Sequence, residues 1–330
     1  MKLAGVLLGW LCLLGGPLFA QTDAGLTDAV SVNYVMVPFT VLGPKGVPLT
    51  TVSEKDITLL VDNVQVATDL FEKSMKAPVS FTILLDGSGS MALAGKMDAA
   101  RAAVRAFIAS KRPGDEFSLY VFDDRETIEV VPPTPDATKV LRALDTVKPY
   151  GKTAFFDAVA TMPARSELGT NPTRAIILLS DGIDNSSRLT RLQLAARLEG
   201  VSIPIFPLAL RPYLSPAARR GPSGRVDEEL SDIEMLQEIA DETGGKLFLG
   251  TKPEHFAQAV AGLDQALRAQ YLIGFPPTGK GVVKYRRISL KVAGRDRSVR
   301  VRAGYKGTEP PVLTASRSRG KSKRNERKGS

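Results

Sequence analysis

Oxygen-bearing side chains follow two apolar segments of this sequence. Residues 79–85, VSFTILL, lead into Asp86-Gly87-Ser88-Gly89-Ser90, and residues 175–180 lead into Asp181-Gly182. A third segment, Tyr150-Gly151-Lys152-Thr153, offers another hydroxyl just before a predicted helix. Carboxylates and hydroxyls without sulfur or imidazole favour Mg²⁺, or Ca²⁺ or Mn²⁺, over zinc. We therefore expect a hard divalent cation at these residues.

Strands and helices are predicted to alternate around these segments. The apolar patterns predict strands at 79–85, 117–122, 127–131, 175–179, 201–210 and 246–249, and helices at 96–110, 155–166, 189–198, 230–242 and 254–269. This alternation indicates a parallel sheet covered on both faces, an α/β fold. Ligands bind such sheets beyond the C-terminal strand ends, where the strand order reverses. If the strands at 79–85 and 175–179 flank that reversal, Asp86, Ser88, Ser90 and Asp181 share one crevice.

The residues on either side of this region are predicted to form strands alone. Residues 30–42 and 57–61 precede it, and residues 271–275, 285–292 and 298–303 follow it. Alternating apolar and polar residues in the later strands are typical of an antiparallel sheet with one buried face. We hypothesise that an α/β domain at 78–269 is inserted into a β-sandwich-like domain, formed by strands at 25–77 pairing with strands at 270–307.

The first twenty residues are typical of a secretory signal peptide. Lys2 precedes an apolar run at 3–14, Gly15-Gly16-Pro17 ends it, and Ala20 offers a small residue for cleavage. An uncleaved anchor is the alternative, but this run is shorter than the roughly 20 apolar residues of a membrane span. We expect a secreted or periplasmic protein. Its only cysteine, Cys12, lies in the signal peptide, which excludes disulfides and thiolate metal sites from the mature chain.

The positive charge of the chain is concentrated near its end. The net charge is +9, and residues 315–330 hold seven Lys or Arg against one Glu. We expect residues 308–330 to be a disordered basic tail. Its charge could bind anionic lipid or cell-wall polymer at the envelope surface, or nucleic acid, which the secretory signal disfavours. A predicted loop at 211–229 carries Arg211, Arg219, Arg220 and Arg225. These arginines either steer an acidic partner or belong to a solvated insertion.

The polar segments resemble a known family. The order Asp86-x-Ser88-x-Ser90, Thr153, Asp181-Gly182 resembles the metal-ion-dependent adhesion site of von Willebrand factor A (VWA) domains, whose fold is doubly wound and Rossmann-like. The flanking segments, including Gln270–Phe275 and Gly304-Tyr305, resemble a secreted bacterial family called VWA-related. The resemblance implies Ser88, Ser90 and Thr153 as direct metal ligands, with Asp86 and Asp181 acting through water. Neutral hydroxyl ligands leave the cation free to attract a carboxylate of a partner protein.

We therefore expect a protein-binding module rather than an enzyme, with Mg²⁺, or Ca²⁺ or Mn²⁺, and no small-molecule cofactor. Two alternatives stay open: a metal-dependent hydrolase with Asp86 or Asp181 as base, and a structural envelope protein whose metal braces the loops. The only histidine, His255, starts an amphipathic helix and is interpreted as a surface or interface residue. Side chains interpreted either as neighbours of the metal or as plain turn residues are Asp123, Asp124, Asp184 and Asn185.

Overall fold

The computed structural model describes residues 34–74, 77–210, 225–250, 253–277 and 281–308, all within one compact unit. The predicted signal peptide, the basic tail from residue 309 and the side chain of His255 lie outside this description, as do residues 211–224 of the arginine-bearing loop. That loop is shorter than predicted, because a helix begins at Arg225. In the described part of the chain, every helix is too short or too polar to cross a membrane.

A six-stranded sheet forms the centre of the α/β part, in the order β10-β9-β8-β5-β6-β7. Its strands are β5 (Val79–Asp86), β6 (Glu116–Phe122), β7 (Thr127–Thr134), β8 (Thr173–Ser180), β9 (Ile205–Ala209) and β10 (Phe248–Leu249). Neighbouring strands are parallel, except that β7 is antiparallel to β6. All eight residues of β5 are buried, as expected for a central strand covered on both faces.

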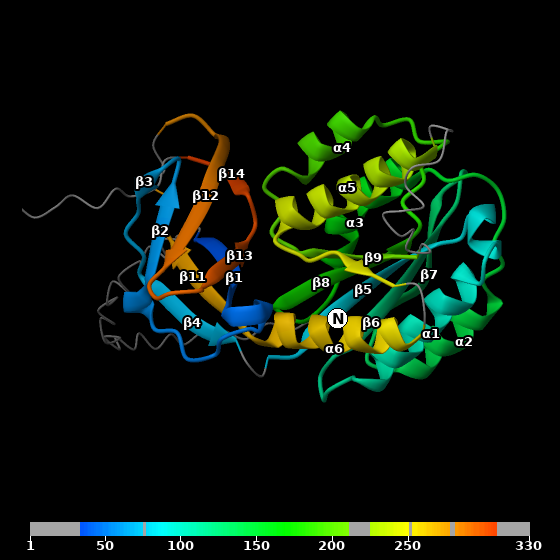
Figure 1. Ribbon diagram of the computed structural model, residues 1–330, viewed down its shortest axis with the longest axis horizontal. Helices are drawn as coiled ribbons and strands as arrows, with labels where there is room; N and C mark the ends of the chain where they lie inside the picture. The colour runs from blue at the N-terminus through cyan, green and yellow to red at the C-terminus, as the bar shows by residue number, and fades with distance from the viewer. Residues whose placement is uncertain (1–33, 75–76, 211–224, 251–252, 278–280, 309–330) are drawn as a thin grey trace, which may run out of the picture. The chain divides into compact units, whose positions relative to one another are not determined.

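Helices cover both faces of this sheet (Figure 1). One face is covered by α1 (Lys96–Ala109), α2 (Ala137–Thr146) and α6 (Pro253–Arg268), and the other by α3 (Phe155–Ser166), α4 (Arg191–Leu198) and α5 (Arg225–Thr243). On the first face, Phe107 packs edge-on against Phe81, with ring centroids 4.6 Å apart. On the second, Phe122 packs against Phe155. Each face therefore has its own hydrophobic core.

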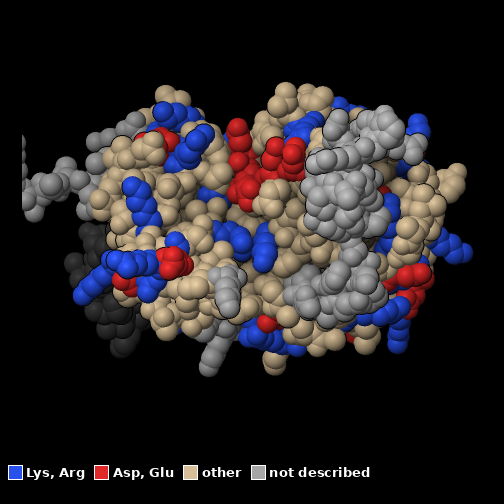
Figure 2. All heavy atoms as spheres, in the orientation of Figure 1, with Lys and Arg blue, Asp and Glu red and all other residues tan. Residues whose placement is uncertain are grey.

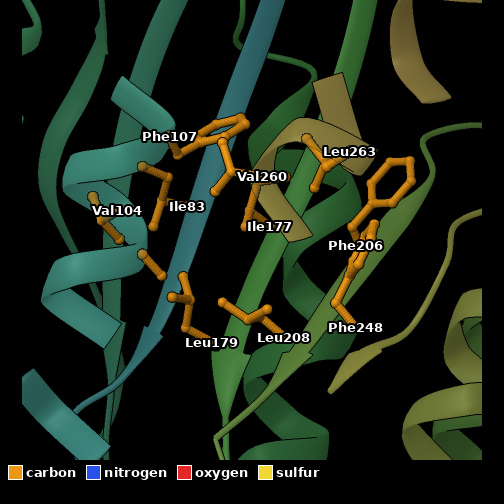
Figure 3. A pocket seen from close by; sticks show the side chains of 11 residues that line it. Ile83, Val104, Phe107, Ile177, Leu179, Phe206, Leu208, Phe248, Val260 and Leu263 are labelled. Carbon is orange, nitrogen blue, oxygen red and sulfur yellow. The ribbon is translucent and has the colours of Figure 1, made fainter. Parts of the chain in front are cut away.

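The core beneath α1 and α6 encloses a cavity of about 20 Å³ (Figure 3). Apolar side chains line it from both the sheet and the helices, among them Ile83, Val104, Phe107, Leu208 and Val260. A water molecule needs polar partners to stay in such a space. Because its lining is apolar, we expect the cavity to hold no water.

The strand order reverses between β5 and β8. β5 pairs with β6 on one side, where Asp86 is opposite Phe122, and with β8 on the other, where Leu85 is opposite Leu179. The chain runs from β5 outward through β6 and β7, and then returns to the opposite side of β5 as β8. The ends of β5 and β8 thus flank the reversal, as the sequence predicted, and their following loops emerge at the same edge.

Two small antiparallel sheets are built from strands at both ends of the described chain. One has the order β13-β1-β11-β4, with β1 (Val35–Leu42), β4 (Leu70–Ser74), β11 (Gln270–Phe275) and β13 (Ser298–Val301). The other has the order β14-β12-β2-β3, with β2 (Ile57–Val61), β3 (Val64–Gln65), β12 (Lys284–Val292) and β14 (Gly304–Gly307). Both contribute to one core, in which Phe39 stacks on Tyr271. The predicted fold class is confirmed, while the domain boundaries stay a prediction.

A buried ion pair lies where the chain passes between the small sheets and the α/β part. Nη2 of Arg268, the last residue of α6, is 2.6 Å from Oδ2 of the fully buried Asp115. Its Nη1 donates to the carbonyl of Ala77, and the Asp115 carboxylate accepts the N–H of Val79, the first residue of β5. The pair therefore connects both chain crossings, one entering β5 and one leaving α6.

Candidate metal site

The loop after β5 folds around its own carboxylate. Asp86, the last residue of the strand, is fully buried, and its Oδ1 accepts the backbone N–H of Ser88 at 2.9 Å. The hydroxyl oxygens of Ser88 and Ser90 are 3.1 Å apart, with Ser88 buried and Ser90 partly exposed. Two side-chain hydroxyls thus lie together at the C-terminal end of the central strand.

The loop after β8 adds a second buried carboxylate. Ser180, the last residue of β8, donates its hydroxyl to Oδ2 of Asp86 at 2.6 Å. Asp181 follows, also fully buried, and its Oδ1 accepts the N–H of Ile183. Burial raises the pKa of the Asp86 carboxyl to about 6. Hydrogen bonds from Ser180 and Ser88 oppose this rise, and the negative charge of Asp181 adds to it, so the two carboxylates repel each other.

The third loop is bound to both of the others. Gly89 donates its N–H to the carbonyl of Gly151 at 3.0 Å, and Tyr150 donates to the carbonyl of Gly87 at 2.8 Å. Thr153 is buried, and its N–H donates to Oδ1 of Asn185 at 2.8 Å. The structure therefore brings together the three segments that carry the predicted residues Asp86, Ser88, Ser90, Thr153 and Asp181. Their role in metal binding stays a prediction.

Two glycines allow the loop after β5 and the loop before α3 to pack closely against β6 and the turn that follows it. Gly151 has a φ of +81°, and a Cβ there would lie 2.5 Å from Oδ1 of Asp124. A Cβ on Gly87 would lie 2.7 Å from a methyl carbon of Val121, on the neighbouring strand. A side chain at position 87 or 151 would therefore force Val121 or Asp124 to move, and at Gly151 the positive φ adds backbone strain.

Asp123, Asp184 and Asn185, which the sequence left open as metal neighbours or turn residues, form hydrogen bonds that fix the loops. Asp123 forms an ion pair with Arg125 and accepts its N–H, which closes the turn after β6. Asp184 accepts the N–H of Phe155, one of the backbone N–H groups in the first turn of α3 that have no partner within the helix. Asn185 also donates its own N–H to the carbonyl of Thr153. Asp184 and Asn185 therefore fix the third loop from the loop after β8.

Sequence reasoning missed two residues of this site. Ser180 had only one signal, a polar residue at the end of an apolar strand directly before Asp181. Lys96, the first residue of α1, places its Nζ 2.6 Å from Oδ2 of Asp181. The Lys96 side chain is 14% exposed and that of Asp181 is fully buried, so the pair is largely shielded from water. No local pattern pairs residues that are 85 positions apart.

The oxygen donors fit a hard divalent cation. Two neighbouring hydroxyls and two buried carboxylates, one of them paired with Lys96, form a site rich in oxygen donors. Such a site prefers Mg²⁺, Ca²⁺ or Mn²⁺. In the part of the chain that the structure describes, no cluster of three or more His, Cys, Asp or Glu side chains could hold a metal. Metal binding here would therefore depend on the serine and threonine hydroxyls.

The fold and these loops define an α/β protein with an oxygen-rich site at the reversal of its sheet. Residues 81–183 match the family model of the von Willebrand factor type A domain, a segment that includes Ser88, Ser90, Thr153 and Asp181. The chain therefore contains a segment of the VWA type at residues 81–183. A comparison with curated proteins gave no match.

Several solved structures are similar to the chain. An aerotolerance-related membrane protein from Bacteroides fragilis is 21% identical, with a TM-score of 0.44 over 57% of this chain and 98% of its own. A von Willebrand factor type A protein from Catenulispora acidiphila is 14% identical, with a TM-score of 0.45 over 84% of this chain and 74% of its own. The vWF domain of a type V pili tip protein from Porphyromonas gingivalis is 14% identical, with a TM-score of 0.42 over 57% of this chain and 94% of its own.

Proposed function

We propose that this protein is a binding module that captures an acidic side chain of a partner protein through a divalent cation. The observation that carries the proposal is the pair of Ser88 and Ser90 hydroxyls, 3.1 Å apart, beside the buried carboxylates of Asp86 and Asp181. The cation is Mg²⁺, or Ca²⁺ or Mn²⁺, as the oxygen donors favour.

Each residue has a distinct task in this proposal. Ser88, Ser90 and Thr153 would hold the metal directly, and Asp86 and Asp181 would orient water molecules around it. The bound cation would supply positive charge that neutral hydroxyl ligands leave only partly balanced, and this charge would attract a partner carboxylate. Asp86 keeps its orientation because both of its oxygens already accept hydrogen bonds, one from Ser88 and one from Ser180.

A hydrolytic role has less support than binding. A general base must reach the proton that it removes. Both oxygens of Asp86 accept hydrogen bonds, and Asp181 accepts from Lys96 and from the N–H of Ile183. Both carboxylates are also fully buried. These contacts favour a positioning role for Asp86 and Asp181 over proton transfer.

A purely bracing role for the metal also has less support. Backbone hydrogen bonds already join the loop after β5 to the third loop, through Gly89–Gly151 and Tyr150–Gly87. Asn185 joins the third loop to the loop after β8. Because these hydrogen bonds already join the loops, binding of a partner is the more useful task for a cation at this edge of the sheet.

The location of the protein is part of the proposal. The predicted signal peptide at 1–20 supports a secreted or periplasmic protein. The seven basic residues of 315–330 support contact of the tail with anionic lipid or cell-wall polymer rather than nucleic acid. Deleting 315–330 should abolish salt-sensitive binding to anionic vesicles, and unchanged binding would exclude the tail as the contact.

Calorimetric titration with Mg²⁺ tests the metal site. Ser88→Ala and Thr153→Ala should each weaken Mg²⁺ binding at least about tenfold, with an unchanged circular dichroism spectrum. Thr161→Ala is a matched control, because the Thr161 hydroxyl donates to the Ala158 carbonyl within α3. Titration curves equal to the wild type for both site variants would reject the site. Capture of a partner from envelope extract should then require Mg²⁺ and fail with chelator or with Ser88→Ala.

A further inference from the structure

Lys96 introduces a fixed positive charge into the candidate metal site. Its Nζ lies 2.6 Å from Oδ2 of Asp181, a distance at which an ammonium and a carboxylate form a strong charge-assisted hydrogen bond. Lys96 begins α1, and Asp181 begins the loop after β8, so the bond joins two separate elements. Only 14% of the Lys96 side chain is exposed, which limits screening by water and salt.

The effect of the bond between Lys96 and Asp181 depends on the other charges in the site. Asp86 and Asp181 are both fully buried, and Ser180, which donates its hydroxyl to Asp86, directly precedes Asp181. The Lys96 ammonium therefore offsets negative charge that would otherwise make the pair of buried carboxylates costly. A divalent cation held beside the same carboxylates would offset that charge as well. The ammonium and the metal repel each other, and the repulsion is strong at short range in a site shielded from water.

We propose that Lys96 sets the metal affinity of this site as a competing cation attached to the protein. The proposal rests on the proposed function. The ammonium stabilises the fold when no metal is bound, and it lowers the affinity for the metal, because binding must displace or weaken its contact with Asp181. The flexible four-carbon stem lets Lys96 turn away toward solvent, so one side chain links metal loading to the first turn of α1.

Replacing Lys96 separates this proposal from a purely structural role. Lys96→Met removes the charge and keeps much of the side-chain volume. We expect it to bind Mg²⁺ roughly tenfold more tightly, or better, in calorimetry at fixed ionic strength. In chelator, we expect the same variant to melt at a lower temperature than the wild type. A purely structural lysine would lower the melting temperature and would not improve metal affinity.

Three further variants complete the experiment. Lys96→Gln keeps a hydrogen-bond donor for Asp181 without the charge, so it should also bind Mg²⁺ more tightly. It replaces Lys96→Met in the experiment if that variant fails to fold. Lys96→Arg keeps the charge and should bind no more tightly than the wild type. Lys139→Met removes the same charge from an exposed position on α2, and both of its readouts should equal the wild type.

The outcomes distinguish this inference from the proposed function. If Ser88→Ala weakens Mg²⁺ binding while Lys96→Met and Lys96→Gln leave it unchanged or weaker, the metal site stands and the role of Lys96 is wrong. If neither the wild type nor any Lys96 variant binds Mg²⁺ or Mn²⁺, the proposed metal site is wrong, and so is the competition. An unchanged melting temperature of folded Lys96→Met in chelator would refute the charge-balancing role.

Discussion

Ser180 donates its hydroxyl to Oδ2 of Asp86 at 2.6 Å, although the two residues are 94 positions apart in the sequence. Each is the last residue of its strand, β8 for Ser180 and β5 for Asp86. The same hydroxyl accepts the N–H of Gly182, directly after Asp181. A single side chain thus fixes one candidate carboxylate and shapes the loop that carries the other.

Ser180→Ala should affect both stability and metal binding. It removes a donor from a fully buried carboxylate, which should lower the free energy of unfolding by about 1–3 kcal/mol. It should also weaken Mg²⁺ binding several-fold, because Asp86 loses a contact that orients it. Urea unfolding and calorimetry measure the two effects. A variant with wild-type values in both would show that this bond does not position Asp86.

Arg268→Leu should be among the most destabilising single changes in the described chain. It leaves the fully buried Asp115 without its ion-pair partner, which should lower the free energy of unfolding by about 3–5 kcal/mol. Arg112→Leu is the control, since Arg112 pairs with Asp264 while half exposed, and it should change stability by about 1 kcal/mol or less. Chemical denaturation compares them, and equal losses would contradict the importance of the buried pair.

Glu242 should make stability depend on pH. Burial raises the pKa of this carboxyl above the ordinary 4.5, and its Oε1 accepts the hydroxyl of Tyr285 at 2.7 Å. The folded protein therefore binds this proton more tightly than the unfolded chain. Below the ordinary pKa, the protonated Glu242 does not lower the free energy of unfolding. As the pH rises from the ordinary pKa through the raised one, the free energy of unfolding falls, and above that range the full loss is reached.

Glu242→Gln should remove this cost while keeping an acceptor for Tyr285. The variant should be more stable than the wild type near pH 7, and the difference should shrink as the pH falls toward 4. Figure 2 shows acidic side chains gathered on the face over the C-terminal part of α5. The cleft between α4 and α5 is lined by acidic side chains of α5, namely Glu238, Asp241 and Glu242. Thermal melts across the pH range test the prediction, and a constant difference would contradict it.

Filling the cavity beneath α1 should stabilise the protein. Val104 projects into the lined space from α1 (Figure 3), and Val104→Ile adds one methylene group there. We expect a gain of about 0.5–1 kcal/mol in the free energy of unfolding. Val104→Ala enlarges the cavity and should lose about 2 kcal/mol. Denaturant unfolding of both variants measures these changes, and a loss with Ile would show that the space is too narrow for the added group.

Local sequence patterns predicted most of the α/β part. The apolar run at 79–85 became β5, and the helix predicted at 155–166 is α3, because buried strands and amphipathic helices leave clear local signals. The three polar segments could be assigned to strand ends for the same reason. Their proximity followed from a general rule about parallel sheets, once the strands at 79–85 and 175–179 were placed beside each other.

Weaker signals explain the elements that were missed or misplaced. The sequence did not predict α2, which buries only Val140 and Leu144 and begins at the Asp136 cap. The strand predicted at 201–210 starts only at Ile205, because Val201 donates its N–H to Leu198 in the turn that ends α4. Lys96 and Ser180 escaped because their partners lie far away in the sequence. Only the folded chain pairs them.

The position of β1 has a consequence for how the protein is synthesised. β1 pairs with β11 on one side and β13 on the other, so both of its neighbours leave the ribosome after the whole α/β part. Until then, both edges of β1 can pair with other chains. Folding of the small sheets therefore has to wait for a long stretch of translation. A chaperone that covers β1 until β11 and β13 are synthesised would protect these open edges best.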